Sequence, residues 1–485
     1  MTTLSTRTDL EERRERWRAE IARSRDRRVG ADSANTRSIV RFLRKVVLEG
    51  SRVLQYGCGS GEVLAALRPS HGVGVEIAPE CVQAARAAHG EVAGSGNTAT
   101  LEFVEADPER FVREDSFDYV VVSDLLLDCF DVDELLGSVR ASCAPSTRVV
   151  VANYSQVWRP ILKLARALGL AHPRFGNTWF SPTDLRAALE RSGFEIVHDS
   201  PETLVPIHIP LVAAFANRFL AKLPILRAFC LHRMMVARPA PARPAQPPSV
   251  TVIVPARNES GNIQRILDEM PQMGSFTEVI FVEGNSTDDT WDVLQRKVGE
   301  RNDPLIRLLK QPGKGKGDAV RAGFAAARGD ILMILDADLT VPAEMLPRFY
   351  DAVASGHAEF ANGTRLVYRM DEKAMQFLNL IANHFFARAF TFVLGQPVRD
   401  TLCGTKVLTK TNYERLVRNR AYFGDFDPFG DFDLLFGAAR LQLRIRDIPI
   451  RYRERVYGET NISRFRHGIL LFRMLGVAAM KLKFR

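Results

Sequence analysis

A proline-rich stretch near the middle of the chain, RPAPARPAQPP from Arg238 to Pro248, limits how the chain can fold. Proline fixes φ and lacks a backbone donor, so neither a central strand nor a helix interior can run through this stretch. The prolines favour an extended polyproline II conformation, which makes a semi-rigid spacer. The stretch is either a long surface loop within one domain or a tether between two. A chain of 485 residues exceeds what one hydrophobic core usually supports, which favours the tether.

The segment RVLQYGCGSGEVLAAL in the first half predicts a buried strand, a glycine-rich turn and a helix. Gly57, Gly59 and Gly61 would let a ligand approach the backbone closely at the N-terminus of this helix. The next expected strand, GVGVEI, ends near Glu76, where a carboxylate can accept hydrogen bonds from both hydroxyls of a ribose. A dinucleotide fingerprint needs a third glycine where Glu62 stands, so a nicotinamide site is not predicted.

This pattern resembles the class I S-adenosylmethionine-dependent methyltransferases over roughly Arg37 to Arg238. Further expected strands lie in LEFVEADPERF, FDYVVVSDLLLDCF, TRVVVANYS and SPTDLRAALERSGFEIVHDS, with LHRMMVAR as an antiparallel seventh strand. The resemblance implies a Rossmann-like sheet that binds S-adenosylmethionine through Gly57, Gly59, Gly61, Glu76, Ile77, Asp107 and Ser123. The chain departs from the family at Gln55, because an acidic residue is usual two places before the first glycine.

No catalytic base for methyl transfer is evident in the sequence. Candidates for contact with the methyl acceptor are Asp124, Asp128, Tyr154 and His172. Asp124 has the best case, because it follows the fourth strand at the carboxyl edge of the expected sheet, where ligands bind. Each of these side chains is more often a helix cap or a satisfied core group than a base.

After the proline-rich stretch, the alternation of strand, turn and helix starts again with VTVIVPARNESGNI and EVIFVEGNSTDDTWDVL. A later apolar strand, Ile331 to Leu335, runs directly into Asp336 and Asp338. Two carboxylates at the end of such a strand are costly unless they are neutralised. Mg²⁺ or Mn²⁺ together with a diphosphate would neutralise them, because these ions take oxygen ligands. A solvated acidic turn is the alternative, since a DxD pattern is short.

The order PARNE, EGNSTDD, GKGDAVRAG and DAD resembles the family 2 inverting glycosyltransferases of the nucleotide-diphospho-sugar transferase fold over roughly Ser249 to Arg466. Within that family it is most similar to the polyprenyl-phosphate and dolichyl-phosphate sugar synthases. The resemblance implies a GT-A type sheet in which Asp336 and Asp338 hold the metal and the diphosphate. It places nucleotide-sugar contacts at Pro255, Ala256, Asn258, Glu259, Glu283, Lys316, Asp336, Ala337 and Asp338.

The resemblance also implies catalytic roles for Asp338, Asp431 and Asp433. An acid near Asp431 would act as general base toward a hydroxyl acceptor, whereas a phosphate acceptor needs no base. A carboxylate favoured by the dipole at a helix N-terminus explains Asp431 equally well. Downstream arginines could grip a pyrophosphate or form a solvated basic face, namely Arg451, Arg453, Arg455, Arg464 and Arg466.

The expected fold class is therefore α/β with two domains, joined by the proline-rich linker. The expected parts are a charged helical extension at 1–36, a methyltransferase-like domain at 37–237, the linker at 238–248, a glycosyltransferase domain at 249–466 and a basic amphipathic tail at 467–485. Glutamates and arginines recur at helical spacing in the extension, so we expect a solvated, salt-bridged helix.

The net charge of +9 suits an anionic partner. Because the basic run of the extension is balanced by glutamates, nucleic acid is not the expected partner. The expected partners are a nucleotide-diphosphate sugar and a phosphorylated lipid or glycan acceptor. Apolar segments at 207–231, 377–394 and 468–480 are each broken by Arg, Lys or His, so they indicate core or interfacial helices rather than spans. Core is favoured for the middle one.

The N-terminus lacks the apolar core of a signal peptide, and the cysteines form no CxxC pair. We therefore expect a cytoplasmic protein, with peripheral contact at the inner face of the membrane. The expected function is a bifunctional enzyme that uses S-adenosylmethionine in one half and a metal-dependent sugar donor in the other. The alternative is a glycosyltransferase whose methyltransferase-like half only binds or scaffolds, and Gln55 favours it.

Overall fold

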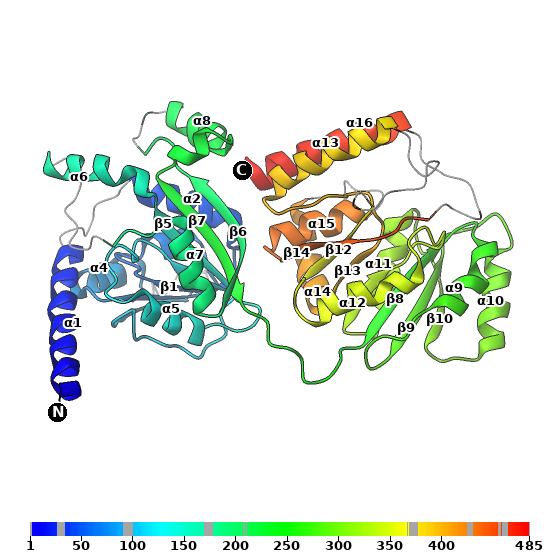
Figure 1. Cartoon of the computed structure of the whole chain (residues 1–485), viewed down its shortest axis with the longest axis horizontal. Helices are drawn as coiled ribbons and strands as arrows, with labels where there is room; N and C mark the ends of the chain where they lie inside the picture. The colour runs from blue at the N-terminus through cyan, green and yellow to red at the C-terminus, as the bar shows by residue number, and fades with distance from the viewer. Residues whose placement is uncertain are drawn as a thin grey trace. The chain divides into compact units, whose positions relative to one another are not determined.

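The computed structural model divides into two units, Met1–Ala240 and Pro241–Arg485, and each is described by itself. It describes residues 2–26, 34–90, 100–168, 178–206, 209, 211–365, 367, 377–423, 430–453, 457 and 464–484. Each unit is an α/β structure built on one seven-stranded sheet (Figure 1). The expected fold class is thus confirmed.

The sheet of the first unit has the strand order β3-β2-β1-β4-β5-β7-β6. Its strands are β1 (Arg52–Tyr56), β2 (His71–Glu76), β3 (Thr100–Glu105), β4 (Tyr119–Val122), β5 (Arg148–Tyr154), β6 (Phe194–Glu202) and β7 (His232–Pro239). The first five strands are parallel, and β7 runs antiparallel between β5 and β6, as the sequence predicts. The order reverses between β1 and β4, and ligands of open α/β sheets bind at the carboxyl edge of such a switch point.

Helices cover both faces of this sheet, which explains why its central strands are apolar on both sides. One face packs on α5 (Val132–Ala141) and α7 (Pro182–Arg191). The other packs on α2 (Ala34–Val46), α3 (Glu62–Ala66) and α4 (Pro79–His89). The remaining helices of the unit are α1 (Thr2–Asp26), η1 (Gln156–Trp158), α6 (Arg159–Ala167), α8 (Val212–Arg218), η2 (Leu220–Lys222) and η3 (Leu226–Phe229).

The sheet of the second unit has the order β10-β9-β8-β11-β13-β12-β14. Its strands are β8 (Val250–Ala256), β9 (Thr277–Glu283), β10 (Ile306–Lys310), β11 (Ile331–Ile334), β12 (Phe360–Thr364), β13 (Lys406–Thr409) and β14 (Ile445–Pro449). Strands β8 to β11 are parallel, and β13 is antiparallel to both β11 and β12. This mixed sheet agrees with the GT-A type fold that the sequence predicts.

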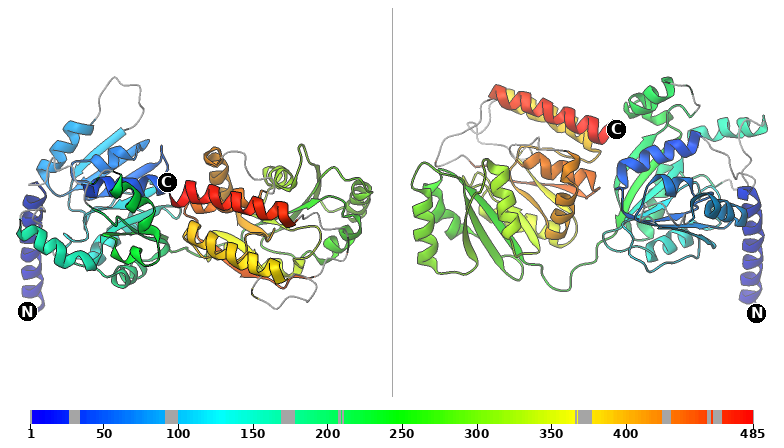
Figure 2. Two further views of the ribbon diagram at one scale, coloured as in Figure 1. Left: turned by 90° about the horizontal axis from the view of Figure 1, so that it is seen from above. Right: turned by 180° about the vertical axis from the view of Figure 1, so that it is seen from behind.

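The helices of the second unit are α9 (Ile263–Glu269), α10 (Thr290–Arg301), α11 (Lys316–Ala326), α12 (Leu346–Ala354), α13 (Phe377–Leu394), α14 (Lys410–Arg418), α15 (Asp431–Arg440) and α16 (Arg464–Ala478). Figures 1 and 2 show α13 and α16 side by side as an outer layer. Phe386 of α13 packs on Phe472 of α16 with ring centroids 5.0 Å apart, while Phe390 is buried against α15. Phe385 and Phe472 are exposed, so this layer is only partly core. Within the described part of the chain, no helix has the length and apolar character needed to cross a bilayer.

The proline-rich stretch begins inside the first sheet. Arg238 and Pro239 still pair with Glu195 and Phe194 of β6, and Arg238 forms an ion pair with Glu195 at 2.7 Å. Residues 240–247 are exposed and belong to no helix or strand.

Candidate active sites

The glycine-rich turn of the first unit lies between β1 and α3. Gly57, Gly59 and Gly61 have φ values of +74°, +54° and +81°, which side chains rarely adopt. A Cβ at Gly61 would also lie 2.7 Å from the ring of Phe103. The turn is tied to the second strand, because the Gly59 N–H donates to Glu76 Oε2 at 2.9 Å. The sequence-predicted turn and the acid after β2 therefore meet at the switch point.

The Glu76 carboxylate is buried and already accepts four hydrogen bonds. Its Oε1 accepts from the backbone N–H groups of Ile77 at 2.9 Å and Ala78 at 3.2 Å. Its Oε2 accepts from Gly59 N and from Arg25 Nη2 at 2.8 Å. A carboxylate offers about four acceptor positions, so this one is filled. The hydroxyls of a ribose would have to compete with Arg25.

Arg25 comes from the end of α1 and is buried at the centre of the expected cofactor site. Its guanidinium also donates to the carbonyls of Gly57 at 3.3 Å and Asp124 at 3.1 Å, and to Asp128 Oδ2 at 3.3 Å. Burial lowers the pKa of Arg25, but the charges of Glu76 and Asp128 outweigh it and leave that pKa above its usual value. The cation therefore remains charged at every relevant pH.

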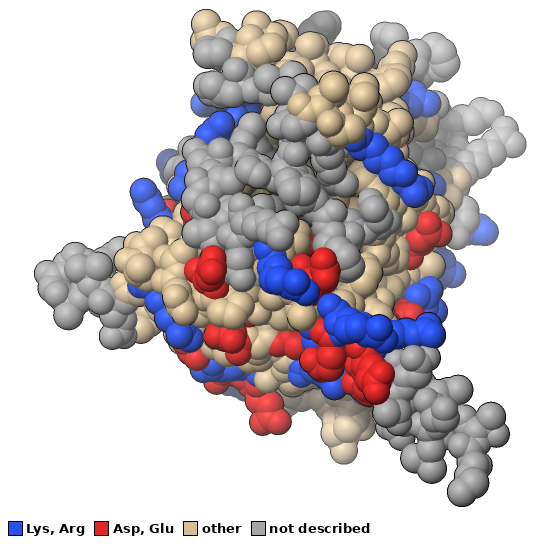
Figure 3. All heavy atoms as spheres, turned by 90° about the vertical axis from the view of Figure 1, so that its left-hand side faces the viewer, with Lys and Arg blue, Asp and Glu red and all other residues tan. Residues whose placement is uncertain are grey.

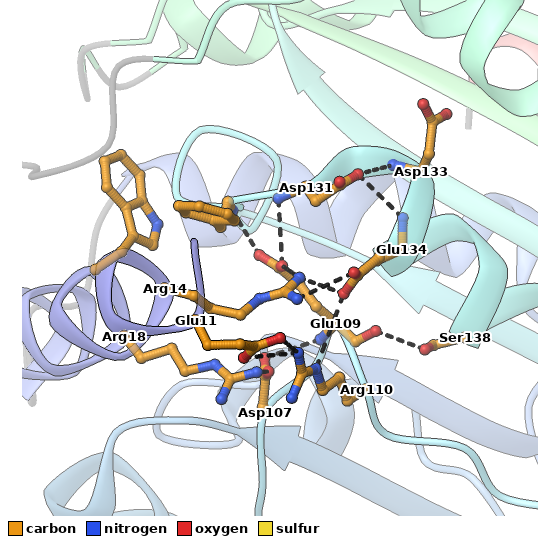
Figure 4. A network of polar contacts seen from close by, with 12 residues as sticks. Glu11, Arg14, Arg18, Asp107, Glu109, Arg110, Asp131, Asp133, Glu134 and Ser138 are labelled. Atoms are coloured by element: carbon orange, nitrogen blue, oxygen red, sulfur yellow. Dashed lines mark hydrogen bonds and ion pairs between the residues drawn. The ribbon is translucent and has the colours of Figure 1, made fainter. Parts of the chain in front are cut away.

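Helix α1 is fixed to the unit by further ion pairs (Figure 4). Arg14 is buried against Glu109, 3.0 Å away, and also contacts Glu134, while Arg18 contacts Asp107. The expectation of a solvated extension is wrong for this face of the helix. Its partners are carboxylates some ninety or more positions away in the chain, which helical spacing within the extension cannot reveal.

Asp107 is another expected contact for S-adenosylmethionine. One carboxylate oxygen accepts from the backbone N–H of Glu109 at 3.0 Å, and the other contacts Arg18. Like Glu76, this acid lies at the carboxyl edge and is engaged by an arginine of α1.

Gln55 and Ser123 form a buried pair beside the glycine turn. The amide Nε2 of Gln55 donates to Ser123 Oγ at 2.8 Å, whereas Gln55 Oε1 has no hydrogen-bond partner among the described residues. Buried polar atoms are rarely left in this state. Whichever way the amide is turned, one of its polar atoms remains without a partner among the described residues.

Asp124 and Tyr154 lie at the ends of β4 and β5. The Tyr154 hydroxyl donates to Asp124 Oδ1 at 2.9 Å, and Asp124 has a φ of 58°. The ring of Tyr154 lies 4.9 Å from that of His232. Of the other acceptor candidates, Asp128 is buried against Arg25, and His172 lies outside the described residues.

In the second unit, the ends of β8 and β9 bring one group of predicted residues together. Ala256 pairs directly with Glu283, which is buried and accepts from the backbone N–H of Ser286 at 2.5 Å. The other predicted members follow along the chain, namely Pro255, Asn258 and Glu259. Asn258 has a φ of 56°, and its Oδ1 accepts from the N–H of Thr287 at 2.8 Å. Glu259 accepts from Asn262 at 2.7 Å.

Lys316 connects the next group. It opens α11, and its Nζ lies 2.6 Å from Asp336 Oδ1 and 3.9 Å from Asp431 Oδ2. Burial lowers the pKa of Lys316, but Asp336 and Asp431 together raise it above its usual value. A Cβ at Gly404 would overlap the side-chain ends of Asp336 and Lys316, so a larger residue there would displace this pair.

The second carboxylate of the DxD sequence, Asp338, accepts from Thr340 N at 3.1 Å and Thr340 Oγ1 at 2.8 Å through Oδ1. Ala337 between the two acids is buried. Among the described residues, no group of three or more His, Cys, Asp or Glu is placed to hold a metal ion. Mg²⁺ is commonly held by one or two carboxylates with substrate phosphates completing its shell. Asp336 and Asp338 fit a site of this kind.

The structure separates the two acids at the start of α15. Asp431 faces Lys316, because Gly317 and Gly430 allow the starts of α11 and α15 to touch: a Cβ at Gly317 would lie 2.9 Å from Gly430 N. Asp433 instead pairs with Arg420 at 2.7 Å and lines a cavity of about 80 Å³.

The predicted basic residues beyond β14 are only partly described. Arg451 is exposed, and Arg453 pairs with Glu344 at 2.8 Å. Arg455 and the side chains of Arg464 and Arg466 lie outside the described residues.

Comparison with known families assigns both units. The sequence model of a family described as "Methyltransferase domain" matches residues 11–199, and that of "Glycosyl transferase family 2" matches residues 251–420. The chain joins a methyltransferase domain to a family 2 glycosyltransferase domain. The match of the methyltransferase domain includes most of α1.

Three curated relatives with names of sugar transferases are each similar to part of the chain. A dolichyl-phosphate hexose transferase of Haloferax volcanii is 29% identical over 220 residues, which are 45% of this chain and 89% of the relative. Glycosyltransferase AglJ of the same organism is 28% identical over 228 residues, 47% of this chain and 70% of the relative. A dolichol-phosphate mannosyltransferase of Pyrococcus furiosus is 33% identical over 120 residues, 24% of this chain and 33% of the relative.

Two solved structures are similar to one half each. A glucosyl-3-phosphoglycerate synthase of Mycobacterium tuberculosis has a TM-score of 0.37 and 19% identity, covering 48% of this chain and 80% of that one. An S-adenosylmethionine-dependent methyltransferase of Mesorhizobium loti has a TM-score of 0.32 and 20% identity, covering 43% of this chain and 99% of that one.

The arginines of α1 are the residues of the methyltransferase domain that the sequence pattern missed. A signal was present, because Arg14, Arg18, Ile21 and Arg25 recur at spacings of four, three and four, which place them on one helix face. Ile21 is buried on that face, and a lone isoleucine among arginines indicates a face that packs.

Proposed function

We propose that the glycosyltransferase domain moves a sugar from a nucleotide diphosphate to a polyprenyl phosphate with inversion. The observation that carries this proposal is the Lys316 ammonium between Asp336 and Asp431, at the edge where β8, β9 and β11 end. The names of relatives support the acceptor class. They include a dolichyl-phosphate hexose transferase and an undecaprenyl-phosphate 4-deoxy-4-formamido-L-arabinose transferase.

In this reaction an acceptor phosphate oxygen attacks the anomeric carbon. The bond from that carbon to the β-phosphate oxygen breaks, and the nucleoside diphosphate leaves with the electron pair. Glu283 and Asn258 bind the nucleoside end of the donor. Lys316 orients the carboxylates of Asp336 and Asp431. Asp336 and Asp338 would hold Mg²⁺ or Mn²⁺, and such an ion would neutralise charge on the leaving diphosphate.

Asp431 has a role with either class of acceptor, a phosphate or a hydroxyl. A phosphate acceptor is already ionised, so Asp431 then serves to hold Lys316. A hydroxyl acceptor on a glycan would lose its proton to Asp431 as the new bond forms. Asp433 takes no part in this scheme, because it pairs with Arg420.

The methyltransferase domain, in the same proposal, binds S-adenosylmethionine at the carboxyl edge of β1, β2 and β4. The free polar atom of Gln55 fits the amino-acid end of the cofactor, and Glu76 fits the ribose once Arg25 has left. When bound, the cofactor supplies a methyl group on a sulfonium. Asp124, oriented by Tyr154, accepts the proton of a hydroxyl acceptor.

A second candidate function is a glycosyltransferase with a silent methyltransferase-like domain. The Arg25–Glu76 pair favours it, because it fills the site where the ribose would bind. Calorimetry of the full chain with S-adenosylmethionine separates the two functions, since a silent domain releases no heat.

Contact with a membrane is part of this proposal. The α13–α16 layer exposes Phe385, Ile469 and Phe472, and Arg473 of α16 is exposed as well. Apolar side chains next to cations are typical of helices that lie in a lipid interface. At the cytoplasmic face of a membrane, this layer would bring the domain to a polyprenyl phosphate.

Sugar transfer is tested with labelled UDP- and GDP-sugars and a polyprenyl phosphate in detergent. Label enters the organic phase if the proposal holds, and Asp336→Asn abolishes this transfer. Asp351→Asn, which changes an exposed acid of α12, is the matched control. Transfer that survives Asp336→Asn, or label that reaches only water-soluble products with every sugar, would contradict the proposal.

A further inference from the structure

The segment between β6 and β7 of the methyltransferase domain holds two of its polar side chains, Asn217 and Lys222, inward. Asn217 is 7% exposed and bonds both ways with the main chain of Val205, at 2.8 Å in each direction. Lys222 is 5% exposed and pairs with Glu202 at the end of β6. These contacts fix α8 and η2 to the sheet.

Several large apolar side chains of the same segment point outward. Phe215 is 56% exposed, Ile225 is 78% exposed and Phe229 is 54% exposed. A soluble amphipathic segment normally does the opposite and buries its apolar stripe. Because the polar groups anchor this segment, the exposed apolar side chains are held in place on a fixed scaffold.

Helix α6 extends this apolar surface. Ile161 and Leu164 are exposed along it, and the Trp158 indole N–H donates to the carbonyl of Phe229 at 2.8 Å. That bond joins the start of α6 to η3. We call the exposed set Ile161, Leu164, Phe215, Ile225 and Phe229 the α6–η3 surface.

The charge around the α6–η3 surface is of one sign. The chain has no aspartate or glutamate between Glu134 and Asp184, nor between Glu202 and Glu259. Four described cations on these helices are exposed, namely Arg159, Lys163, Arg218 and Arg227. Figure 3 shows the face seen from the left-hand side of Figure 1. Most acidic side chains lie in the lower half of this face, with tan and blue atoms toward the top.

The α6–η3 surface adjoins the acceptor side of the methyltransferase site. Leu231, two residues after Phe229, packs in one cluster with Tyr154 and Trp158. Its carbonyl accepts from Ser155 N at 2.7 Å. Tyr154 in turn holds Asp124, the expected contact for the methyl acceptor.

We propose that the α6–η3 surface docks on an anionic lipid bilayer, and that the methyltransferase domain takes its acceptor from that bilayer. Exposed Phe, Ile and Leu enter the boundary between headgroups and acyl chains, and the flanking Arg and Lys pair with lipid phosphates. The acceptor is then a lipid-anchored molecule that presents its head to Asp124. The second half of this proposal rests on the cofactor function proposed above, whereas lipid docking does not.

Docking is measured by sedimentation of the full chain with vesicles of phosphatidylcholine and phosphatidylglycerol, without cofactor. Phe215→Glu and Ile225→Glu each lower the partition constant on the order of tenfold, because each places a charge where an apolar side chain was buried. Val112→Glu, an exposed apolar position of the same domain, leaves it unchanged. All variants are compared in an Ile469→Glu background, which removes the contribution of α16.

Binding of Phe215→Glu and Ile225→Glu equal to that of Val112→Glu overturns the proposal. So does equal binding to vesicles of phosphatidylcholine alone, which would remove the role of the cations. Light scattering without lipid tests whether the surface instead binds a second copy of the chain. A dimer that these two variants dissociate would show such binding and overturn the proposal.

The acceptor class is tested with vesicles of the source organism's own membrane lipids and methyl-labelled S-adenosylmethionine. Label in the organic phase that Phe215→Glu reduces and Val112→Glu does not supports a lipid-anchored acceptor. Label that appears only in water-soluble products overturns it. Vesicle binding without any methyl transfer would refute the cofactor function and leave the docking surface standing.

Discussion

Replacing Arg25 with methionine should separate stability from cofactor binding in the methyltransferase domain. Methionine keeps an unbranched stem and removes the guanidinium, with its contacts to Glu76, Asp128 and two carbonyls. Both carboxylates are buried, and breaking a buried ion pair costs about 3–5 kcal/mol. We therefore expect the free energy of unfolding without ligand to fall by about this amount.

The same substitution should strengthen the binding of S-adenosylmethionine. In the native chain the ribose must displace Arg25 from Glu76 Oε2, and a hydrogen bond to a charged group is worth about 1.5–3 kcal/mol. In Arg25→Met that oxygen keeps only the Gly59 N–H and can accept a ribose hydroxyl, and the positive sulfonium and amino group of the cofactor restore charge balance. We expect the Kd to fall by roughly 10- to 100-fold, since each factor of ten corresponds to about 1.4 kcal/mol.

Calorimetric titration gives the affinity, and thermal unfolding with and without cofactor gives the stability. Arg23→Met is the matched control, because Arg23 lies on the same helix, is exposed and pairs only with Glu20 and its own helix in the described structure. It should change neither quantity. Weaker binding in Arg25→Met would mean that the guanidinium is a ligand of the cofactor rather than its competitor. No binding by either variant would favour the silent domain.

Three further changes test the two sites. Asp338→Asn should lower the kcat of sugar transfer by on the order of 10²–10³-fold, because a bound metal acts on charge that grows in the transition state. Nucleotide binding, measured by titration, should change little. Excess chelator should lower the kcat in the same way, and full activity in chelator would refute the prediction. Gly404→Ala should abolish sugar transfer while methyl transfer survives, since its Cβ would overlap Asp336 and Lys316; loss of both activities would point to unfolding instead. Gln55→Leu should weaken S-adenosylmethionine binding by about 1–3 kcal/mol, because the polar atom left for the cofactor is gone; an unchanged Kd in calorimetry would remove Gln55 from the site.

The sequence predicted those parts of the sites that depend on where a parallel strand ends. Glu76, Glu283 and Asp336 each follow or end an apolar strand, and the carboxyl ends of parallel strands meet at one edge of a sheet. The antiparallel β7 was also predictable, because LHRMMVAR is a buried strand between clear boundaries. The local sequence pattern was sufficient in these cases, because a residue at the end of a parallel strand must lie at the carboxyl edge of the sheet.

Contacts between helices far apart in sequence could not be predicted in the same way. The choice between Asp431 and Asp433 depends on the approach of Gly317 to Gly430, which sets one acid against Lys316 and turns the other toward Arg420. Both acids fit a helix N-terminus equally well in the sequence.

The arginines of α1 show why charge spacing alone misleads. Within the extension, Glu and Arg alternate at distances that satisfy one another, and Arg18 does pair with Glu15 at 2.5 Å. Yet the same Arg18 contacts Asp107, and Arg25 lies buried against Glu76. A buried carboxylate at a ligand site must be compensated when the ligand is absent, and a cation from outside the sheet meets that need. A carboxylate that a domain keeps for a ligand therefore predicts a compensating cation somewhere in the chain, and the search for it should begin with arginines that share a helix face with a lone apolar residue.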